Sequence, residues 1–455
     1  MPHHRILRAS MALALLLASG IARAHGTLPT ANGIAFGATG GTLYGTNFGG
    51  LWQAVAGGST LFVCETLVTG EPRSLDAWIW LGSGRVVAAT TSGGFAFGVF
   101  AASDASACNF ATVAGTEDLT VTEVIADPDD ATAFLACGRN DPVAAAHAGR
   151  IVHGTPDAIR VVYDRPGFTV TGVRARGGHL YASASSSTTI GESLLVHSAD
   201  AGAHWDEWPQ GLAAGEAILP LGVSRADPLT MWLVRQSDAG DRLLRTTDGG
   251  AHFVDVLTVD GPLAAFAQSE DGATVWVQSP TRAVYRSGDG GSTFEGLAGS
   301  PHGACLTFHD GQLFACGVPW QDGLTWGVAA DGRTFAPLAV GFDDIAGPVA
   351  CPTRPEATEM CRKELEFLRG YFGFATPPAP DGIGEGAPEV MGDSEGAGDA
   401  EAAAATETAR GEPVAGAADG CGGGALSDGG AASIAVAGLV LARAFSARRR
   451  PRRAR

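Results

Sequence analysis

An eight-residue pattern recurs three times in the chain and constrains its fold more than any other feature. Each copy has Ser or Thr first, Asp third, Gly fifth, Thr or His seventh and Trp or Phe last. The defining residues are Ser198, Asp200, Gly202 and Trp205; Thr246, Asp248, Gly250 and Phe253; and Ser287, Asp289, Gly291 and Phe294. In this pattern the hydroxyl and carboxylate bond the backbone of their own turn, while Gly takes a positive φ. The aromatic side chain is expected to fold under its hairpin as a small satellite core. These octads therefore predict structural turns, and one carboxylate in each is too few for a calcium site.

Weaker copies of the octad extend the repeat along the chain, at residues 54–61, 103–110, 153–160 and 328–335. Successive copies are 41 to 50 residues apart. Upstream of each copy, a short apolar segment predicts the second strand of an inner hairpin, which again gives seven units. Units of this length with four short strands are typical of propeller blades. The sequence thus predicts an all-β fold, a seven-bladed β-propeller of four-stranded antiparallel blades, over residues 25–350.

The octads resemble the Asp-box, or bacterial neuraminidase repeat. This resemblance implies a β-propeller of the sialidase-like, photosystem II assembly-factor-like and sortilin-like superfamily, with each octad between the third and fourth strands of a blade. It does not extend to sialidase chemistry. The Phe/Tyr-Arg-Ile-Pro motif of sialidases is missing, and Tyr163-Asp164-Arg165-Pro166 departs from it at two of four positions. Seven units also differ from the six-bladed sialidase scaffold, so sialidase activity is not expected.

The first 24 residues have the pattern of a secretory signal peptide. Arg5 and Arg8 precede an apolar stretch, and the small-residue triplet 22–24 predicts cleavage by signal peptidase after Ala24. The apolar run is too short for a membrane span. We therefore expect an exported protein whose cysteines meet an oxidising compartment.

The C-terminal part begins with an acidic, Pro/Gly/Ala-rich stretch at residues 376–420, which cannot bury enough apolar surface to fold. It is predicted to be a disordered tether with a span of about 35 to 40 Å. Residues 421–455 follow, with Cys421 between glycines, an apolar segment interrupted by Arg443, and a terminal Arg cluster. This order resembles the MYXO-CTERM sorting signal. The resemblance implies cleavage by a sorting protease near Cys421 and attachment at the cell surface or outer membrane. Before processing, the Arg tail would lie on the cytoplasmic side of the inner membrane. The alternative is a weak membrane anchor that stays uncut.

Six cysteines are candidates for disulfides. Cys305 and Cys316 are equidistant from the turn at Asp310-Gly311, so a hairpin places them opposite each other. Cys351 and Cys361 are expected to close a loop in a C-terminal extension, residues 351–375, that contains a short helix near residues 363–369. Cys64 and Cys108 are expected to link neighbouring blades. Cys137 is then left unpaired. No C-x2-C spacing supports zinc.

The sequence contains no established catalytic motif, and no cofactor or metal is predicted. A net charge of -18, with a single Lys outnumbered by 29 Arg, excludes a nucleic-acid partner. Propellers bind ligands over the face opposite such octads, where four polar loops are expected at residues 138–149, 183–192, 235–241 and 317–326. The candidate ligand-binding residues there are Arg139, Arg235, Trp320 and Trp326, because aromatic and Arg side chains are common binding anchors.

These patterns together predict a secreted, surface-attached propeller, expected to be a monomer, that acts as a non-catalytic recognition module for an unknown protein or glycan. Membrane contact would be through the C-terminal segment or its processed Cys alone. Two alternatives remain: a glycan-active hydrolase or lyase on the same scaffold, and an envelope assembly factor.

Overall fold

The computed structural model describes residues 30–372, apart from 39, 54–57, 71–74, 76, 91–97, 104–106, 141–146 and 339–340. The chain divides into two units, Met1–Thr376 with Cys421–Arg455 and Pro377–Gly420, and every described residue belongs to the first. The predicted cleavage site at Ala24, the tether and the segment containing Cys421 lie outside the described residues. Within the described ranges, no helix is long and apolar enough to span a bilayer.

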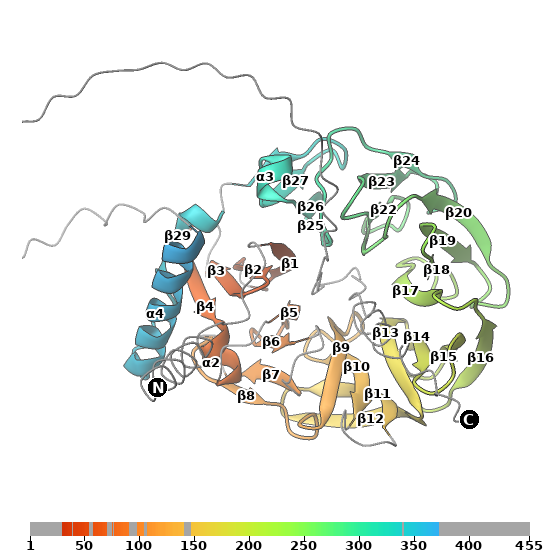
Figure 1. Cartoon of the computed structure of the whole chain (residues 1–455), viewed down its shortest axis with the longest axis horizontal. Coiled ribbons are helices and arrows are strands. Elements are labelled where there is room, and N and C mark those ends of the chain that lie inside the picture. Colours follow the sequence, from red (N-terminus) through yellow and green to blue (C-terminus); the bar gives the residue numbers. More distant parts are fainter. Residues whose placement is uncertain are drawn as a thin grey trace, which may run out of the picture. The chain divides into compact units, whose positions relative to one another are not determined.

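Seven sheets stand around a common centre and form a β-propeller (Figure 1). Each sheet contains four antiparallel strands that follow one another along the chain, and the first strand of each blade is the innermost (Figure 1). The predicted fold class and the predicted number of blades are therefore confirmed.

The strands of blades 1 to 4 are β1 (Ala31–Phe36), β2 (Thr42–Thr46), β3 (Gly49–Gln53) and β4 (Thr60–Cys64); β5 (Ala77–Trp80), β6 (Val86–Ala89), β7 (Val99–Ala102) and β8 (Phe110–Thr112); β9 (Leu119–Ala126), β10 (Phe134–Asn140), β11 (Ala148–Thr155) and β12 (Ala158–Pro166); and β13 (Phe168–Arg176), β14 (His179–Ser186), β15 (Glu192–Ser198) and β16 (Asp206–Gly211). Those of blades 5 to 7 are β17 (Ala217–Val223), β18 (Met231–Gln236), β19 (Asp241–Thr246) and β20 (Val254–Val259); β21 (Ala265–Gln268), β22 (Val275–Gln278), β23 (Val284–Ser287) and β24 (Glu295–Gly296); and β25 (Leu306–His309), β26 (Gln312–Cys316), β27 (Trp326–Ala329) and β28 (Ala336–Pro337).

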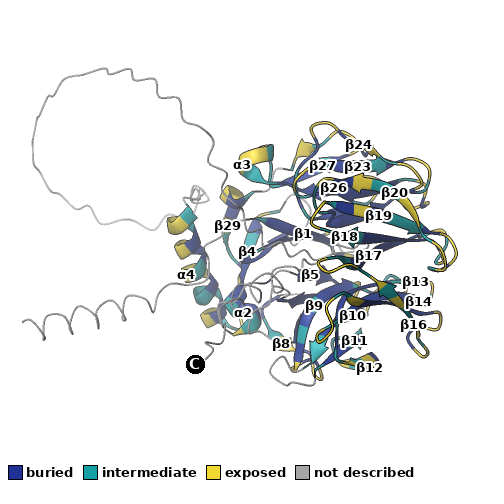
Figure 2. Cartoon of the chain, turned by 45° about the vertical axis from the view of Figure 1, so that its right-hand side comes forward, coloured by how far each residue is buried: buried dark blue, intermediate teal, exposed yellow. Residues whose placement is uncertain are grey.

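Burial falls from the inner strands to the outer strands. The first two strands of most blades are almost wholly buried because neighbouring blades cover both of their faces, whereas β8, β16 and β24 at the circumference are largely exposed (Figure 2). Such buried strands read as apolar runs, for example Val-Val-Ala-Ala in β6. In blade 1 the outermost antiparallel strand, β4, is an exception and is buried.

The C-terminal segment covers β4. Strand β29 (Ile345–Pro348) pairs with β4 in parallel and makes blade 1 five-stranded. Helix α4 (Pro355–Phe372) follows and is longer than the predicted short helix. Its buried residues recur every three or four positions, as an amphipathic helix on a protein surface requires: Ala357, Cys361, Leu365 and Leu368. The other helices of the described residues are α2 (Glu65–Thr69), α3 (Pro319–Asp322) and the 3-10 helix η2 (Phe342–Asp344).

The first and last blades meet through side chains. The Phe36 ring stacks on the His309 ring with centroids 4.1 Å apart, and Thr307 Oγ1 donates a hydrogen bond to Ile34 O at 3.3 Å. In the described part of the chain, the first and last blades share no strand, so these contacts join β1 to β25 across the point where the ring closes.

Three disulfides are present among the described residues. Cys305 pairs with Cys316 across the β25–β26 hairpin, as predicted, with Cα atoms 5.2 Å apart. Cys137 is free, also as predicted, and its side chain is buried.

The other two predicted pairings are wrong. Cys64 pairs with Cys361 and Cys108 pairs with Cys351, with Cα separations of 5.1 and 5.6 Å. The reason is that the C-terminal segment returns to blade 1. Helix α4 packs on β4 and α2, which places Cys361 beside Cys64, while the connection before α4 lies near Cys108 at the end of blade 2.

Candidate functional site

The propeller has two faces that carry different connections. The three octads join the third and fourth strands of blades 4, 5 and 6, so they lie on one face, here called the octad face. The connections between second and third strands lie at the opposite ends of the same strands and form the loop face.

Hydrogen bonds inside each octad fix its turn. In the first octad, Ser198 Oγ donates to Asp200 Oδ1 at 2.9 Å and accepts from Gly202 N at 2.8 Å. Asp200 also accepts from the amide and ring nitrogens of His204, which lowers the pKa of its carboxyl group far below the usual range. The octads at Asp248 and Asp289 repeat this arrangement and the same direction of pKa shift. Each of these carboxylates accepts several hydrogen bonds within its own octad, so its role is to stabilise the turn.

The octads also contact the preceding blade, which the sequence did not predict. Instead of folding under its own hairpin, Trp205 donates its Nε1 hydrogen to Val162 O of blade 3 at 2.7 Å. A Cβ atom on Gly291 would lie 2.4 Å from Trp232 Nε1 of blade 5, and one on Gly250 would lie 2.8 Å from the Trp208 ring of blade 4. The fifth-position Gly therefore allows close approach between blades in addition to supplying a positive φ.

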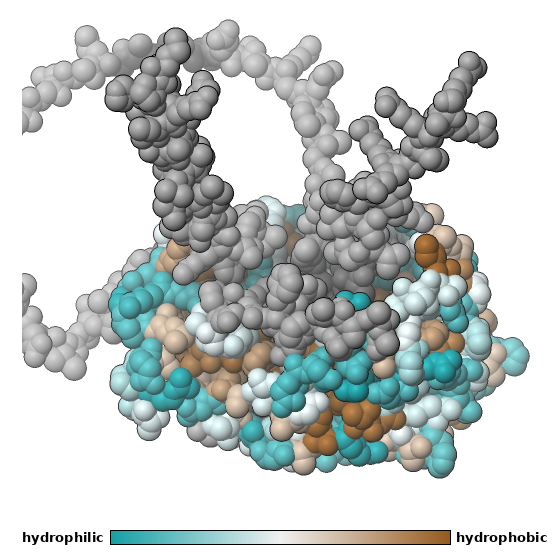
Figure 3. Space-filling view, turned by 60° about the horizontal axis from the view of Figure 1, so that its bottom comes forward, coloured by the Kyte–Doolittle hydropathy of each residue, from teal (hydrophilic) through white to brown (hydrophobic). Residues whose placement is uncertain are grey.

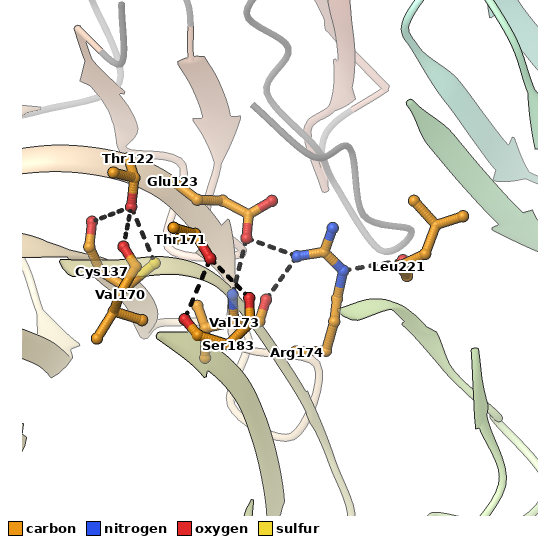
Figure 4. A network of polar contacts seen from close by, with 9 residues as sticks. All are labelled: Thr122, Glu123, Cys137, Val170, Thr171, Val173, Arg174, Ser183 and Leu221. Atoms are coloured by element: carbon orange, nitrogen blue, oxygen red, sulfur yellow. Dashed lines mark hydrogen bonds and ion pairs between the residues drawn. The ribbon is translucent and has the colours of Figure 1, made fainter. Parts of the chain in front are cut away.

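A buried polar network joins the inner strands of blades 3, 4 and 5 (Figure 4). Arg174 Nη1 donates to Glu123 Oε2 at 2.6 Å, and Val173 N donates to the same oxygen at 2.9 Å. Arg174 Nε donates to Leu221 O of blade 5 at 2.9 Å. Burial raises the pKa of Glu123, and the Arg174 guanidinium opposes this rise. The side chains of Glu123 and Arg174 are only 1% and 5% exposed, so the pair lies within the protein interior.

β-Bulges explain how these groups reach one another. The register of β9, β13 and β17 with their second strands skips one residue each, at Thr122, Thr171 and Leu221. A bulge re-aims backbone and side-chain groups away from their own sheet. Here Thr122 Oγ1 donates to Val170 O of the next blade at 2.7 Å (Figure 4). Beside it, the Cys137 thiol is buried near Glu123, and both factors raise its pKa above the usual range. The network ties blades together and offers no accessible nucleophile.

The loop face carries two strongly exposed apolar side chains within the described ranges. Ile190 is 70% exposed in the β14–β15 connection of blade 4, and Trp320 is 58% exposed on α3, in the β26–β27 connection of blade 7. The side of the molecule drawn in Figure 3 mixes small apolar patches with hydrophilic side chains. Exposed side chains of this size are the usual anchors of binding surfaces.

The helix that carries Trp320 is held in place by Asp322. One carboxylate oxygen, Oδ2, accepts from Val318 N at 2.7 Å and from His302 N at 2.9 Å. The other, Oδ1, lies 2.6 Å from His302 Nδ1. His302 belongs to the connection between blades 6 and 7, so Asp322 joins two loops. In the neutral form of His302, the carboxylate selects the tautomer with hydrogen on Nδ1.

Two backbone features complete the loop around Trp320. Gly323 ends α3 with a φ of 69°, where glycine is favoured. A Cβ atom on Gly317 would lie 2.7 Å from the backbone oxygen of Leu324, so a larger residue there would force the backbone to shift. Trp320 thus projects from a loop whose backbone is fixed on both sides, which lowers the entropy lost when a ligand binds.

The four candidate binding residues lie in three blades, with Trp320 and Trp326 both in blade 7. Arg139 is partly exposed on β10 of blade 3. Arg235 on β18 donates to Glu216 Oε2 at 2.6 Å and lowers the pKa of Glu216, which makes it one half of a structural ion pair. Trp326 corrects the prediction of an exposed anchor: its side chain is 0% exposed, and its ring packs 5.0 Å from Tyr44 at the junction of blades 7 and 1. Trp320 remains as the strongly exposed aromatic residue among the four candidates.

His302 and Asp322 were not recognised from the sequence. Asp322 lies two residues after Trp320 in Pro-Trp-Gln-Asp-Gly, a turn-forming composition that could have indicated a capping carboxylate. No spacing connects it to His302, because their contact depends on the packing of two loops. Within the described ranges, no three His, Cys, Asp or Glu side chains form a metal-binding group.

Comparison with known proteins finds similar solved structures, at low sequence identity. No protein-family model matches the chain, and neither does any curated protein. Among solved structures, the GH74 xyloglucanase of Xanthomonas campestris is 14% identical with a TM-score of 0.30, over 70% of this chain and 65% of that one. YCF48 bound to D1 peptide is 15% identical with a TM-score of 0.33, over 49% and 67%. A puromycin-hydrolyzing peptidase of Mycobacterium tuberculosis is 12% identical with a TM-score of 0.49, over 71% and 54%. The chain spans just under two thirds of the xyloglucanase, and at these values no activity follows from the likeness.

Proposed function

We propose that this chain is an exported, surface-attached β-propeller that binds a protein or glycan ligand over its loop face without catalysis. The observation that carries the proposal is the indole of Trp320, which is 58% exposed on helix α3. Asp322 of the same helix fixes this loop by accepting hydrogen bonds from Val318 N and His302 N. An exposed indole on a loop whose backbone is already ordered is a common anchor of binding surfaces, because little conformational entropy is lost when a partner covers it.

Export is supported by the three disulfides, since disulfides persist in oxidising compartments. On this proposal the octads are Asp-boxes that serve structure, and residues 421–455 are a sorting signal that attaches the mature protein through Cys421. The partners during maturation would be signal peptidase and a sorting protease.

The non-catalytic part of the proposal is supported by the roles of the acidic side chains described above. Glu123 is enclosed with Arg174, Asp200 and its counterparts serve turns, and Asp322 anchors a loop. A glycosidase needs two carboxyl groups about 5 to 10 Å apart on either side of a substrate. These carboxylates instead bond the protein's own backbone and side chains.

The test is binding of the purified exported protein to glycan arrays and to cell-envelope fragments. Trp320→Ala should weaken binding about 30-fold or more, as loss of a hot-spot residue of 2 kcal/mol does. Val254→Ala is the matched control, because Val254 is an equally exposed apolar residue (58%) at the start of β20, directly after an octad and therefore on the opposite face. Protease treatment of the envelope should abolish binding to a protein ligand, and periodate should abolish binding to a glycan. Equal binding by the wild type and Trp320→Ala would overturn the site, and cleavage of an arrayed sugar would overturn the absence of catalysis.

A further inference from the structure

The last blade is joined to the first by the C-terminal segment. Every blade in the described part of the chain takes its four strands from one continuous segment. After blade 7 the chain instead crosses to blade 1, where β29 pairs with β4 through Ile345 opposite Thr60 and Pro348 opposite Phe62. Val349 N extends this pairing with a hydrogen bond of 2.8 Å to Phe62 O.

Helix α4 and Arg354, the residue before it, continue the attachment along blades 1 and 2. Thr66 Oγ1 of α2 donates to Glu364 Oε2 at 2.7 Å, and Arg354 Nη1 donates to Cys108 O at 3.0 Å. On the buried face of the helix, Leu365 and Leu368 belong to the same core cluster as β4. Residues 345–372, here called the latch, therefore contact both blades through backbone pairing, side-chain hydrogen bonds and apolar packing.

The two long-range disulfides of the latch are nested. Cys64–Cys361 spans 297 residues and encloses Cys108–Cys351, which spans 243. Cys305–Cys316 spans 11 residues inside a single hairpin and does not involve the latch. A pull on the C-terminal end of α4 therefore reaches Cys361 after one part of the helix and passes through the disulfide to Cys64.

We propose that the latch is a covalent load-bearing attachment, which routes force from the C-terminal side into blade 1 and bypasses blades 2 to 7. Without the disulfides, the same pull would peel off α4, then β29, and then the strands of blade 7 one after another. With them, peeling stops at Cys361. That force acts on the latch in the cell rests on the proposed surface attachment. The route of the force through the molecule depends on the disulfides alone. Surface attachment and force route can therefore be refuted separately.

Single-molecule force spectroscopy of the full chain, pulled between its two ends, tests the load path. In the oxidised wild type, residues 65–360 stay locked. Reduction should release them and add about 1,000 Å of extension, at 3.3 to 3.6 Å per residue. The Cys64→Ala/Cys361→Ala variant should transfer the load to Cys108–Cys351 and add only about 180 Å. Removing that disulfide as well should add about 800 Å more.

The matched control is Cys305→Ala/Cys316→Ala, which deletes a disulfide outside the load path and should leave the extension of the folded wild type unchanged. If a cysteine variant does not fold, reduction of wild-type molecules already attached to the handles gives the same comparison. Full extension of the oxidised wild type would overturn the proposal. So would equal extension of the wild type and the Cys64→Ala/Cys361→Ala variant.

Discussion

Arg174 Nη1 lies 2.6 Å from Glu123 Oε2 and joins the inner strands of blades 3 and 4. Both side chains are buried, so removing either partner leaves an uncompensated charge in the interior. Glu123→Gln and Arg174→Met should each lower the free energy of unfolding by about 3 to 5 kcal/mol. The double variant Glu123→Leu/Arg174→Met should lose less free energy of unfolding than the two single variants together, because it leaves no buried charge. Urea denaturation at pH 7 measures all three.

The control for this pair is the ion pair of Arg282 with Asp260, whose side chains are 48% and 88% exposed. Asp260→Asn should change the free energy of unfolding by less than about 1 kcal/mol, since solvent screens exposed pairs. Losses of similar size for Asp260→Asn and Glu123→Gln would contradict a special role for the buried pair.

Asp241 should make stability fall as pH rises. Burial raises its pKa to about 6, although Leu263 N donates to Asp241 Oδ2 at 2.8 Å. The folded state therefore holds this proton more tightly than the unfolded state. The contribution of Asp241 to stability is greatest below the ordinary pKa of the group and is lost as pH rises towards 6, by at most about 1.4 kcal/mol per pH unit.

Asp241→Asn isolates this effect, because the amide keeps an acceptor for Leu263 N and cannot ionise. Relative to the wild type, the variant should gain stability between pH 4 and pH 6.5 and show no further gain above that range. Denaturation curves at a series of pH values measure the difference. A constant difference between the two proteins at all pH values would show that Asp241 does not titrate in this range.

Two reasons favour glycine in an octad, a positive φ and close approach to the preceding blade, and a comparison of Gly290 with Gly291 separates them. Gly290 has a φ of 65° with no atom within 4 Å of an added Cβ, whereas Gly291 has a φ of 77° and abuts the buried Trp232 ring. Gly290→Ala should cost about 1 to 2 kcal/mol from backbone strain alone. Gly291→Ala should cost a further 1 to 3 kcal/mol, roughly the penalty of overpacking, because Trp232 has no room to move. Thermal melting compares the two, and equal losses would exclude the contact between blades as a cause.

The features that could be predicted from the sequence are those set by nearby residues. The octad spacing predicted seven blades, and the turn at Asp310 predicted Cys305 opposite Cys316. What could not be predicted depends on segments far apart in the chain. Cys361 meets Cys64 because the helix returns to blade 1, and Trp326 is buried because Tyr44 of blade 1 packs against it. Local patterns carry no information about such contacts.

The same division applies to the candidate site. Trp320 was identified as an exposed aromatic residue in a polar loop, which is a local property. The network of Glu123 and Arg174 was not, because its geometry requires bulges in three neighbouring inner strands. The contact of His302 with Asp322 was missed for a similar reason, since it joins two separate loops.

Asp322 should act as a positioning residue for Trp320. Its carboxylate accepts from the backbone N–H groups of Val318 and His302, so Asp322→Ala leaves both donors without their partner. Loss of such bonds costs about 1 to 3 kcal/mol, which corresponds to about 5- to 150-fold faster amide exchange. Hydrogen exchange should show this increase at Val318 and His302, while amides of the distant strand β14 keep their wild-type rates. Ligand binding should weaken in parallel, and Asp322→Asn, which can accept through one oxygen, should restore part of both properties. A variant that loses binding with unchanged exchange in these loops would show that Asp322 contacts the ligand itself.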